Sequence, residues 1–138
     1  MTVDPSPSPS GRPPAEFLGR SAAVTHAVRP DDTATALGSG TVPVLGTPRL
    51  LAWLEEATVR AVADLLDPDH TTVGVEVRLR HLRSSAPGTA VTGDARVESA
   101  EGRTLTFAVT ASAGGGPLLA EGVVRRAVVD VARFLAPA

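Results

Sequence analysis

The chain has 138 residues with a net charge of −2, and it contains no Cys, Lys, Tyr, Asn, Gln or Ile. The absence of Cys excludes disulfides, thiolate nucleophiles and Cys-ligated metals. The absence of Lys excludes Schiff bases and a P-loop lysine. Arg and acidic residues are interspersed, which gives no basic patch for nucleic acid, and no apolar run approaches the roughly 20 residues that span a bilayer.

Two regions of different composition divide the chain. Residues 1–17 begin MTVDPSPSPS, and this Ser/Pro alternation neither packs nor holds a helix, so we expect a disordered tail. Residues 18–138 are rich in Val, Leu and Ala and are long enough for one domain with one core. The first residues lack the charged-then-apolar pattern of a signal peptide, which favours a cytoplasmic protein without membrane association.

A short strand and a long loop come first. Apolar residues alternate over Ser21–Val28, which suits a strand. Residues 29–46 contain Gly, Pro and Asp, with one helical turn expected around Thr33–Leu37. This connection exceeds the common length, and such loops often bind ligands or close over a site.

A helix gives the clearest local signal. Gly46-Thr47-Pro48 predicts its start, with Thr47 as the N-cap and Pro48 at the first helical position. The helix should continue to about Leu66, where Asp67-Pro68-Asp69 stops it. Its apolar stripe at helical spacing consists of Leu50, Leu51, Leu54, Thr58, Ala61, Val62 and Leu65.

Four strands are predicted after the helix, followed by a helical turn. The strands cover Thr72–Leu82, Ala90–Ser99, Thr104–Ala113 and Leu118–Val129. Residues expected on the inner face are Val73, Val75, Val77 and Leu79 in the first strand, Val91, Ala95 and Val97 in the second, and Leu105, Phe107, Val109 and Ala111 in the third. The turn at Asp130–Leu135 is expected to pack Phe134 and Leu135 back against the domain.

This order of elements predicts the α+β class. One strand, one long helix and four consecutive strands suit an antiparallel five-stranded sheet wrapped around a central helix, which is the hot-dog fold. One helix cannot cover everything that such a sheet exposes, so we expect a homodimer or a higher homo-oligomer.

The helix carries two adjacent carboxylates that its geometry separates. At about 100° per residue, Glu55 lies at the edge of the apolar stripe, while Glu56 faces away and can pair with Arg60 at i,i+4. A carboxylate at the edge of a core needs a partner, because burial of an unpaired charge is expensive. Glu55 is therefore the candidate functional carboxylate, with a position at the solvent-exposed rim as the alternative.

His81 and Thr47 are the other candidates for chemistry. His81 is in phase with Val77 and Leu79, so it should point toward the helix, where Glu55 could orient its imidazole. Thr47 lies eight residues before Glu55, roughly 12 Å along the helix axis. The free N–H groups of the helix N-terminus near Thr47 could polarise a carbonyl.

The remaining motifs are weak. His26 is in phase with Val24 and Val28, which favours a structural role, and His70 follows a turn and should be exposed to solvent. No His-x-His or His-x3-His spacing occurs, so we predict neither a metal nor a cofactor. The absence of a G-x-S-x-G motif excludes an α/β-hydrolase triad.

Several segments resemble one known family. The stretches GSGTVPVLGTPRLLAWLEEATVRAV, TTVGVEVRLRHLRSSAPG, GRTLTFAVTA and VDVARF are similar to those of the fluoroacetyl-CoA thioesterase-type hot-dog thioesterases. The resemblance extends from about Val24 to Leu135 and is most specific at the Thr-Pro helix start and at the His81-Leu82 pair with the Pro-Gly that follows.

The resemblance implies a Thr/Glu/His catalytic set. It assigns these roles to Thr47, Glu55 and His81, and it places the active-site glycine of the family at Gly74. Thr41, Val44 and Gly46, in the loop before the helix, are then expected to bind substrate with Gly74. Fluoroacetyl-selective members are expected to carry Phe side chains in this loop. Here it has no aromatic residue, so we predict a thioesterase that is not selective for fluoroacetyl-CoA.

The predicted reaction is hydrolysis of an acyl thioester of coenzyme A or of an acyl carrier protein. His81 could act as general base toward water, or Glu55 could attack the carbonyl to form an anhydride, and Arg125 or Arg126 could bind phosphates of the carrier. A hot-dog protein that binds an acyl thioester or small metabolite without hydrolysis is the alternative. A hot-dog hydratase would need a differently placed Asp–His pair, which the sequence lacks.

Overall fold

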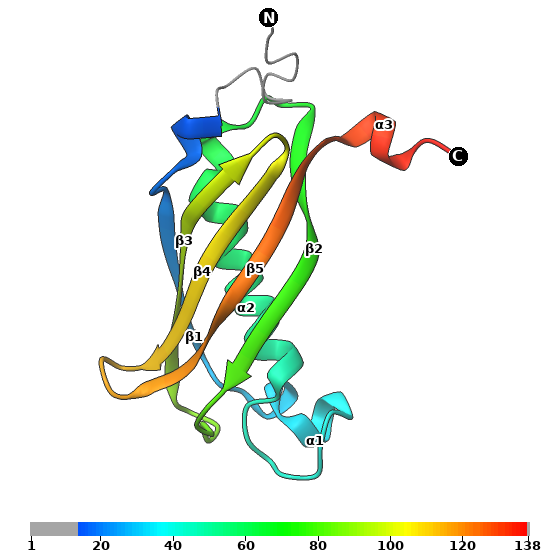
Figure 1. The fold of residues 1–138 in the computed structure, drawn as a ribbon. Helices are drawn as coiled ribbons and strands as arrows, with labels where there is room; N and C mark the ends of the chain where they lie inside the picture. The colour runs from blue at the N-terminus through cyan, green and yellow to red at the C-terminus, as the bar shows by residue number, and fades with distance from the viewer. Residues whose placement is uncertain (1–13, 138) are drawn as a thin grey trace, which may run out of the picture.

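The structure is a computed structural model that describes residues 14–137 (Figure 1). Residues 1–13 of the predicted tail lie outside this range. The rest of that tail, Pro14–Phe17, forms a 3₁₀ turn, and its Phe17 side chain is buried in the core. The folded domain therefore includes residues before the predicted boundary at residue 18.

One antiparallel sheet wraps around one long helix. The strands are β1 (Ser21–Ala27), β2 (His70–His81), β3 (Ala90–Glu101), β4 (Thr104–Ala113) and β5 (Leu118–Asp130). Their order across the sheet is β1-β3-β4-β5-β2, so the two strands that flank the helix in sequence form the two edges. Helix α2 (Thr47–Val62) lies against the inner face of the sheet (Figure 1). This arrangement confirms the predicted α+β hot-dog fold.

The core lies between α2 and the sheet. The seven sheet residues predicted to face inward from β3 and β4 are all at most 2% exposed. The helix buries a wider arc than the predicted stripe, because the curved sheet also covers Trp53 and Ala57, which the stripe omitted. Leu51, which the predicted stripe included, is only half-buried. Among the described residues, no helix has the length and apolar character needed to cross a membrane.

A β-bulge interrupts β2 between Gly74 and Glu76. Before it, Thr72 and Gly74 face the helix; after it, the inward positions are Val77, Leu79 and His81, opposite buried or inner positions of β5. Val75 falls outside the ladder and is 57% exposed. The prediction that every second residue from Val73 to His81 faces inward is therefore wrong upstream of the bulge. His81 points inward as predicted.

The segments outside the sheet and α2 are short. The loop between β1 and α2 contains a 3₁₀ turn (Pro30–Asp32) and helix α1 (Ala34–Leu37), which confirms the predicted helical turn. The chain ends in α3 (Val131–Leu135), which Figure 1 shows projecting from the end of β5. Phe134 and Leu135 are exposed there, so the prediction that they pack back is wrong. The helix leads away from the core instead of folding onto it.

Candidate active site

Thr47 and His81 form a direct contact at the N-terminus of α2. Gly46 is the N-cap, and Thr47 is the first helical residue, so the prediction of Thr47 as N-cap is wrong. Its hydroxyl makes no cap bond and lies 2.8 Å from His81 Nδ1 instead. His81 reaches this position because it is the last residue of β2 and points inward after the bulge.

The second ring nitrogen of His81 is buried and has no hydrogen-bond partner among the described residues. Burial lowers the pKa of His81 below its usual 6.5, and the backbone of Arg83 opposes this decrease. The imidazole is therefore neutral at neutral pH. With Nδ1 fixed by Thr47, Nε2 is the atom available to exchange a proton with a bound molecule.

A pocket of ≈ 260 Å³ adjoins this pair. Its lining residues are Val44, Thr47, His81, Leu82, Arg83 and Ser84. The predicted substrate-binding residue Val44 is thus beside Thr47 and His81. Thr41 is exposed and outside the lining, and Gly46 lies against the backbone of Ala34 and the side chain of Leu37.

The first turn of α2 offers fewer free amides than the sequence predicts. The N–H groups of Arg49 and Leu50 both donate to the Gly46 carbonyl, each at 3.1 Å. Pro48 has no N–H to donate. The hydroxyl of Thr47 and the imidazole of His81 are therefore the main polar groups that this end of the helix presents to the pocket.

Glu55 occupies a second cluster, with Arg126 as its partner. Its Oε2 accepts a hydrogen bond of 3.0 Å from Arg126 Nη1, and the side chains are 35% and 8% exposed. Arg126 also donates from Nε to the Thr72 hydroxyl (2.9 Å) and from Nη2 to the Thr72 carbonyl (3.0 Å). Burial lowers the pKa of Arg126, and the charge of Glu55 opposes that effect.

This cluster corrects two predictions. Glu55 pairs with Arg126 and not with His81. Arg126 is buried and so cannot bind a carrier phosphate at the surface. Its inward position was available in the sequence, because Arg126 is in phase with Val124 and Val128 on β5. The exposed neighbour Arg125 pairs with Glu76.

Gly74 permits the approach of Glu55 to β2. A Cβ atom at this position would lie 2.7 Å from Glu55 Oε2 and 3.5 Å from Arg126 Nη1. Any larger side chain would displace the carboxylate, so glycine is required for the pair in its present geometry. The predicted site residue Gly74 therefore belongs to the Glu55 cluster.

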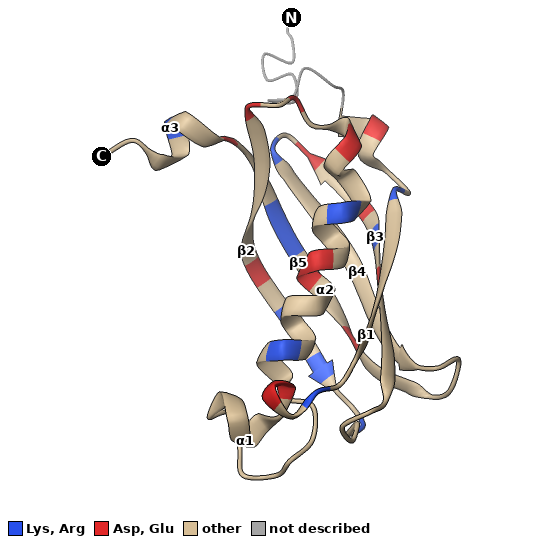
Figure 2. Ribbon diagram, turned by 180° about the vertical axis from the view of Figure 1, so that it is seen from behind, with Lys and Arg blue, Asp and Glu red and all other residues tan. Residues whose placement is uncertain are grey.

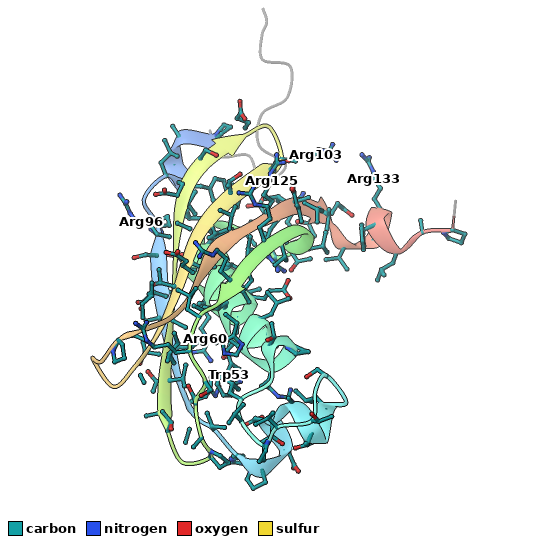
Figure 3. All side chains as sticks on the ribbon, turned by 60° about the horizontal axis from the view of Figure 1, so that its bottom comes forward. Trp53, Arg60, Arg96, Arg103, Arg125 and Arg133 are labelled. Atoms are coloured by element: carbon teal, nitrogen blue, oxygen red, sulfur yellow. The ribbon has the colours of Figure 1, made fainter. Side chains whose placement is uncertain are left out.

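A third polar cluster lies between α2 and β1. Glu56 pairs with Arg60 (2.7 Å) as predicted, but its other oxygen accepts a bond of 2.8 Å from His26 Nε2. This bond lowers the pKa of Glu56. His26 stacks on Trp53, with ring centroids 4.8 Å apart. Figure 3 shows Trp53 and Arg60 on the helix, and Figure 2 shows the charged residues along α2.

His70 is more enclosed than predicted. Its side chain is 12% exposed and bonds to Asp69 at 2.8 Å. Asp67, Asp69 and His70 bring potential ligand atoms within 4.8 Å of one another, with both aspartates exposed. Exposed acidic groups of this kind commonly hold no ion. That the protein binds no metal stays a prediction.

The family model of the fluoroacetyl-CoA-specific thioesterase FlK matches residues 28–132. The chain belongs to this family. It is 33% identical over 91 residues to the fluoroacetyl-CoA thioesterase of Streptantibioticus cattleyicolor, an alignment that covers 66% of this chain and 65% of that protein. The match thus spans slightly less than two thirds of the relative.

Solved structures support the same assignment. An FlK variant, F36A, in complex with fluoroacetate and CoA superposes with a TM-score of 0.79 at 28% identity, over 85% of this chain and 98% of that one. A thioesterase superfamily member from Thermus thermophilus gives a TM-score of 0.79 at 26% identity, over 85% and 86% of the two chains.

Proposed function

We propose that this FlK-family chain hydrolyses acyl thioesters with Thr47, Glu55 and His81, without a cofactor. One observation carries the proposal: the Thr47 hydroxyl holds His81 Nδ1 at 2.8 Å, while His81 Nε2 is buried and unpaired among the described residues. This arrangement suits an imidazole that exchanges a proton with a ligand in the adjoining pocket.

Direct water attack is one route that these residues support. His81 Nε2 accepts a proton from water as the water oxygen bonds to the thioester carbonyl carbon. The tetrahedral intermediate then collapses, the C–S bond breaks, and the protonated imidazole returns its proton to the departing thiolate. A hydrogen bond with Thr47 keeps the ring in one orientation through both transfers.

Glu55 supports a second route, in which its carboxylate attacks the carbonyl. The thiolate leaves, an acyl–Glu55 anhydride forms, and water activated by His81 hydrolyses it. Arg126 is then a positioning residue, because its guanidinium holds Glu55 Oε2 beside Gly74. Trapping of ¹⁸O from labelled water in the Glu55 side chain distinguishes this route from direct attack.

A homodimer would bring the two clusters into one site. Within one chain Glu55 bonds to Arg126 and His81 bonds to Thr47, so the three proposed catalytic residues form two separate groups. Strand β2, which carries His81 and Gly74, is an edge of the sheet and exposes Val75 and Val77. We propose that a second copy pairs at this edge and completes the site with its own Thr47–His81 pair.

The proposed substrate is an acyl thioester other than fluoroacetyl-CoA. The loop before α2 contains no aromatic side chain, and Val44 is the loop residue that lines the pocket. CoA is the carrier bound in the FlK complex noted above, and an acyl carrier protein presents the same thioester group.

Release of thiol from a panel of acyl-CoA and acyl-carrier-protein thioesters tests the proposal. We expect turnover by the wild type and its loss in His81→Ala, with most activity retained in His26→Ala as the matched control. No turnover of any thioester, together with measurable binding, would favour the non-hydrolytic alternative.

A further inference from the structure

Arg83 introduces a positive charge into the pocket of the Thr47–His81 pair. The pocket is lined by Val44, Thr47, His81, Leu82, Arg83 and Ser84. None of these lining residues is acidic, and Arg83 is the one that carries a permanent charge. A fixed cation in the lining attracts an anionic group, and the Glu55 carboxylate that a second copy would bring to this site is already paired with Arg126.

Backbone and side-chain bonds hold Arg83 in place. The amides of Leu82 and Arg83 both donate to the Leu119 carbonyl, at 2.7 and 3.2 Å. Arg83 Nη1 donates to the carbonyl of Leu118 at 2.5 Å. The residue is therefore anchored to β5 at both its backbone and its guanidinium. One of its five N–H donors is used in this way, which leaves others for a ligand.

The position of Arg83 selects the part of a substrate that it can reach. Arg83 follows His81 by two residues, just beyond the end of β2, and both residues line the pocket. In a thioester substrate the reacting carbonyl lies next to His81, and the phosphates of the carrier lie beyond the long pantetheine arm. A group close to the carbonyl, on the acyl side, is the one within reach of Arg83.

We infer that Arg83 binds a terminal carboxylate of the acyl group, so that the preferred substrates are thioesters of short dicarboxylic acids. This inference rests on the proposed thioesterase function and names its substrate class. The planar guanidinium suits a carboxylate, with which it forms charge-assisted hydrogen bonds. A pocket of ≈ 260 Å³ suits a short acyl chain.

Matched substrate pairs test the inference. Malonyl-CoA and propionyl-CoA differ by the terminal carboxylate, and glutaryl-CoA and valeryl-CoA provide the same comparison for a longer chain. We expect the wild type to prefer one dicarboxylic substrate in kcat/KM. Arg83→Gln, which keeps a donor for the Leu118 carbonyl, should reduce this preference, the ratio of kcat/KM for the dicarboxylic substrate to that for its neutral partner, by about 10- to 100-fold.

Arg96→Gln is the matched control, because Arg96 is exposed on β3, away from this pocket and from the β2 edge, and the substitution removes the same charge. An unchanged preference in Arg83→Gln, with neutral acyl-CoAs hydrolysed normally, overturns the inference and leaves the proposed function intact. An equal loss of kcat/KM for the dicarboxylic and the neutral member of a pair also overturns the inference, because Arg83 would then bind the carrier.

Calorimetry covers the case in which no thioester is hydrolysed. Tighter binding of malonyl-CoA than of propionyl-CoA, abolished by Arg83→Gln, would support the carboxylate site while the hydrolytic function fails. Equal binding of both esters by the wild type would overturn the inference.

Discussion

Glu55 and Glu56 are neighbours in sequence with different environments. The side chain of Glu55 meets the buried Arg126 on β5, and that of Glu56 meets His26 on β1 and Arg60 on the helix. The difference follows from the 100° rotation per helical residue, which turns one carboxylate toward each edge of the sheet. Helical geometry thus separates a candidate reactive group from a structural one.

Substitution by Gln distinguishes the two carboxylates. Glu55→Gln keeps an acceptor for Arg126 but removes the charge, and we expect kcat to fall by at least about 100-fold. Glu56→Gln should change kcat by less than about twofold while weakening the contact with His26. Steady-state thiol release measures both variants. Equal losses, or a loss confined to Glu56→Gln, would contradict the assignment.

The pKa of His81 sets the expected pH dependence. Burial lowers this pKa below 6.5, so the imidazole is neutral and basic at pH 7. Activity should be retained as the pH falls through 6.5 and should decline only at lower pH, where His81 becomes protonated. A profile of kcat/KM against pH measures this. An acid limb centred above pH 6.5 would contradict the lowered pKa of His81, and a profile without an acid limb would contradict its general-base role.

Among the elements, β2 contributes most to the site, through its bulge. The extra residue places Gly74 inward on one side of the bulge and His81 inward on the other. An unbroken strand with His81 inward would turn Gly74 outward, because side chains alternate. The bulge is therefore what allows one strand to contact Glu55 through Gly74 and Thr47 through His81.

Two Gly→Ala substitutions should separate function from stability. In Gly74→Ala the new methyl group lies too close only to the terminal carboxylate of the Glu55 side chain, with Arg126 Nη1 at an ordinary contact distance, so we expect less than about 1 kcal/mol of destabilisation but a large loss of activity. In Gly122→Ala the Cβ would lie 2.1 Å from the Arg78 carbonyl oxygen on β2, and we expect more than about 2 kcal/mol of destabilisation.

Denaturant unfolding and thiol release together measure this contrast. A strongly destabilised Gly74→Ala with normal specific activity would show that the glycine is required for strand packing and not for the position of Glu55. A stable Gly122→Ala would mean that β2 and β5 can separate at that point.

Sequence periodicity was sufficient to predict the fold and the inward direction of the His81 side chain. It was not sufficient to predict which residue His81 contacts. Alternation of apolar and polar residues over β3 and β4 identified their buried residues, because the two faces of each strand differ clearly from each other in polarity. A bulge leaves no such signature, because Val73, Val75 and Val77 are all apolar. The Glu55–Arg126 pair joins residues 71 positions apart, and only the strand register decides whether they meet.

At the scale of the whole molecule, complementation between subunits tests the proposed shared site. Glu55→Ala and His81→Ala chains, each inactive alone, should regain about a quarter of wild-type activity when mixed through unfolding and refolding. The reason is that each mixed dimer contains one site with both residues intact.

Thr47→Ala mixed with His81→Ala is the control. Thr47 and His81 contact each other within one chain, so each chain of the mixed dimer carries a damaged Thr47–His81 pair. No activity should therefore return. Rescue in the control, or none in the test mixture, would contradict a site that combines Glu55 of one copy with His81 of another. Sedimentation of each mixture verifies that dimers have formed.

The stack of His26 on Trp53 has a practical consequence. Trp53 is the single Trp of a chain that has no Tyr, so its indole dominates the near-ultraviolet absorbance and the intrinsic fluorescence of the protein. The centroid of its ring lies 4.8 Å from that of the His26 imidazole on the edge strand β1, so separation of β1 from α2 would change the surroundings of the indole. The emission intensity therefore follows the docking of β1 onto α2, and a single optical signal, obtained without labelling, reports on one defined contact.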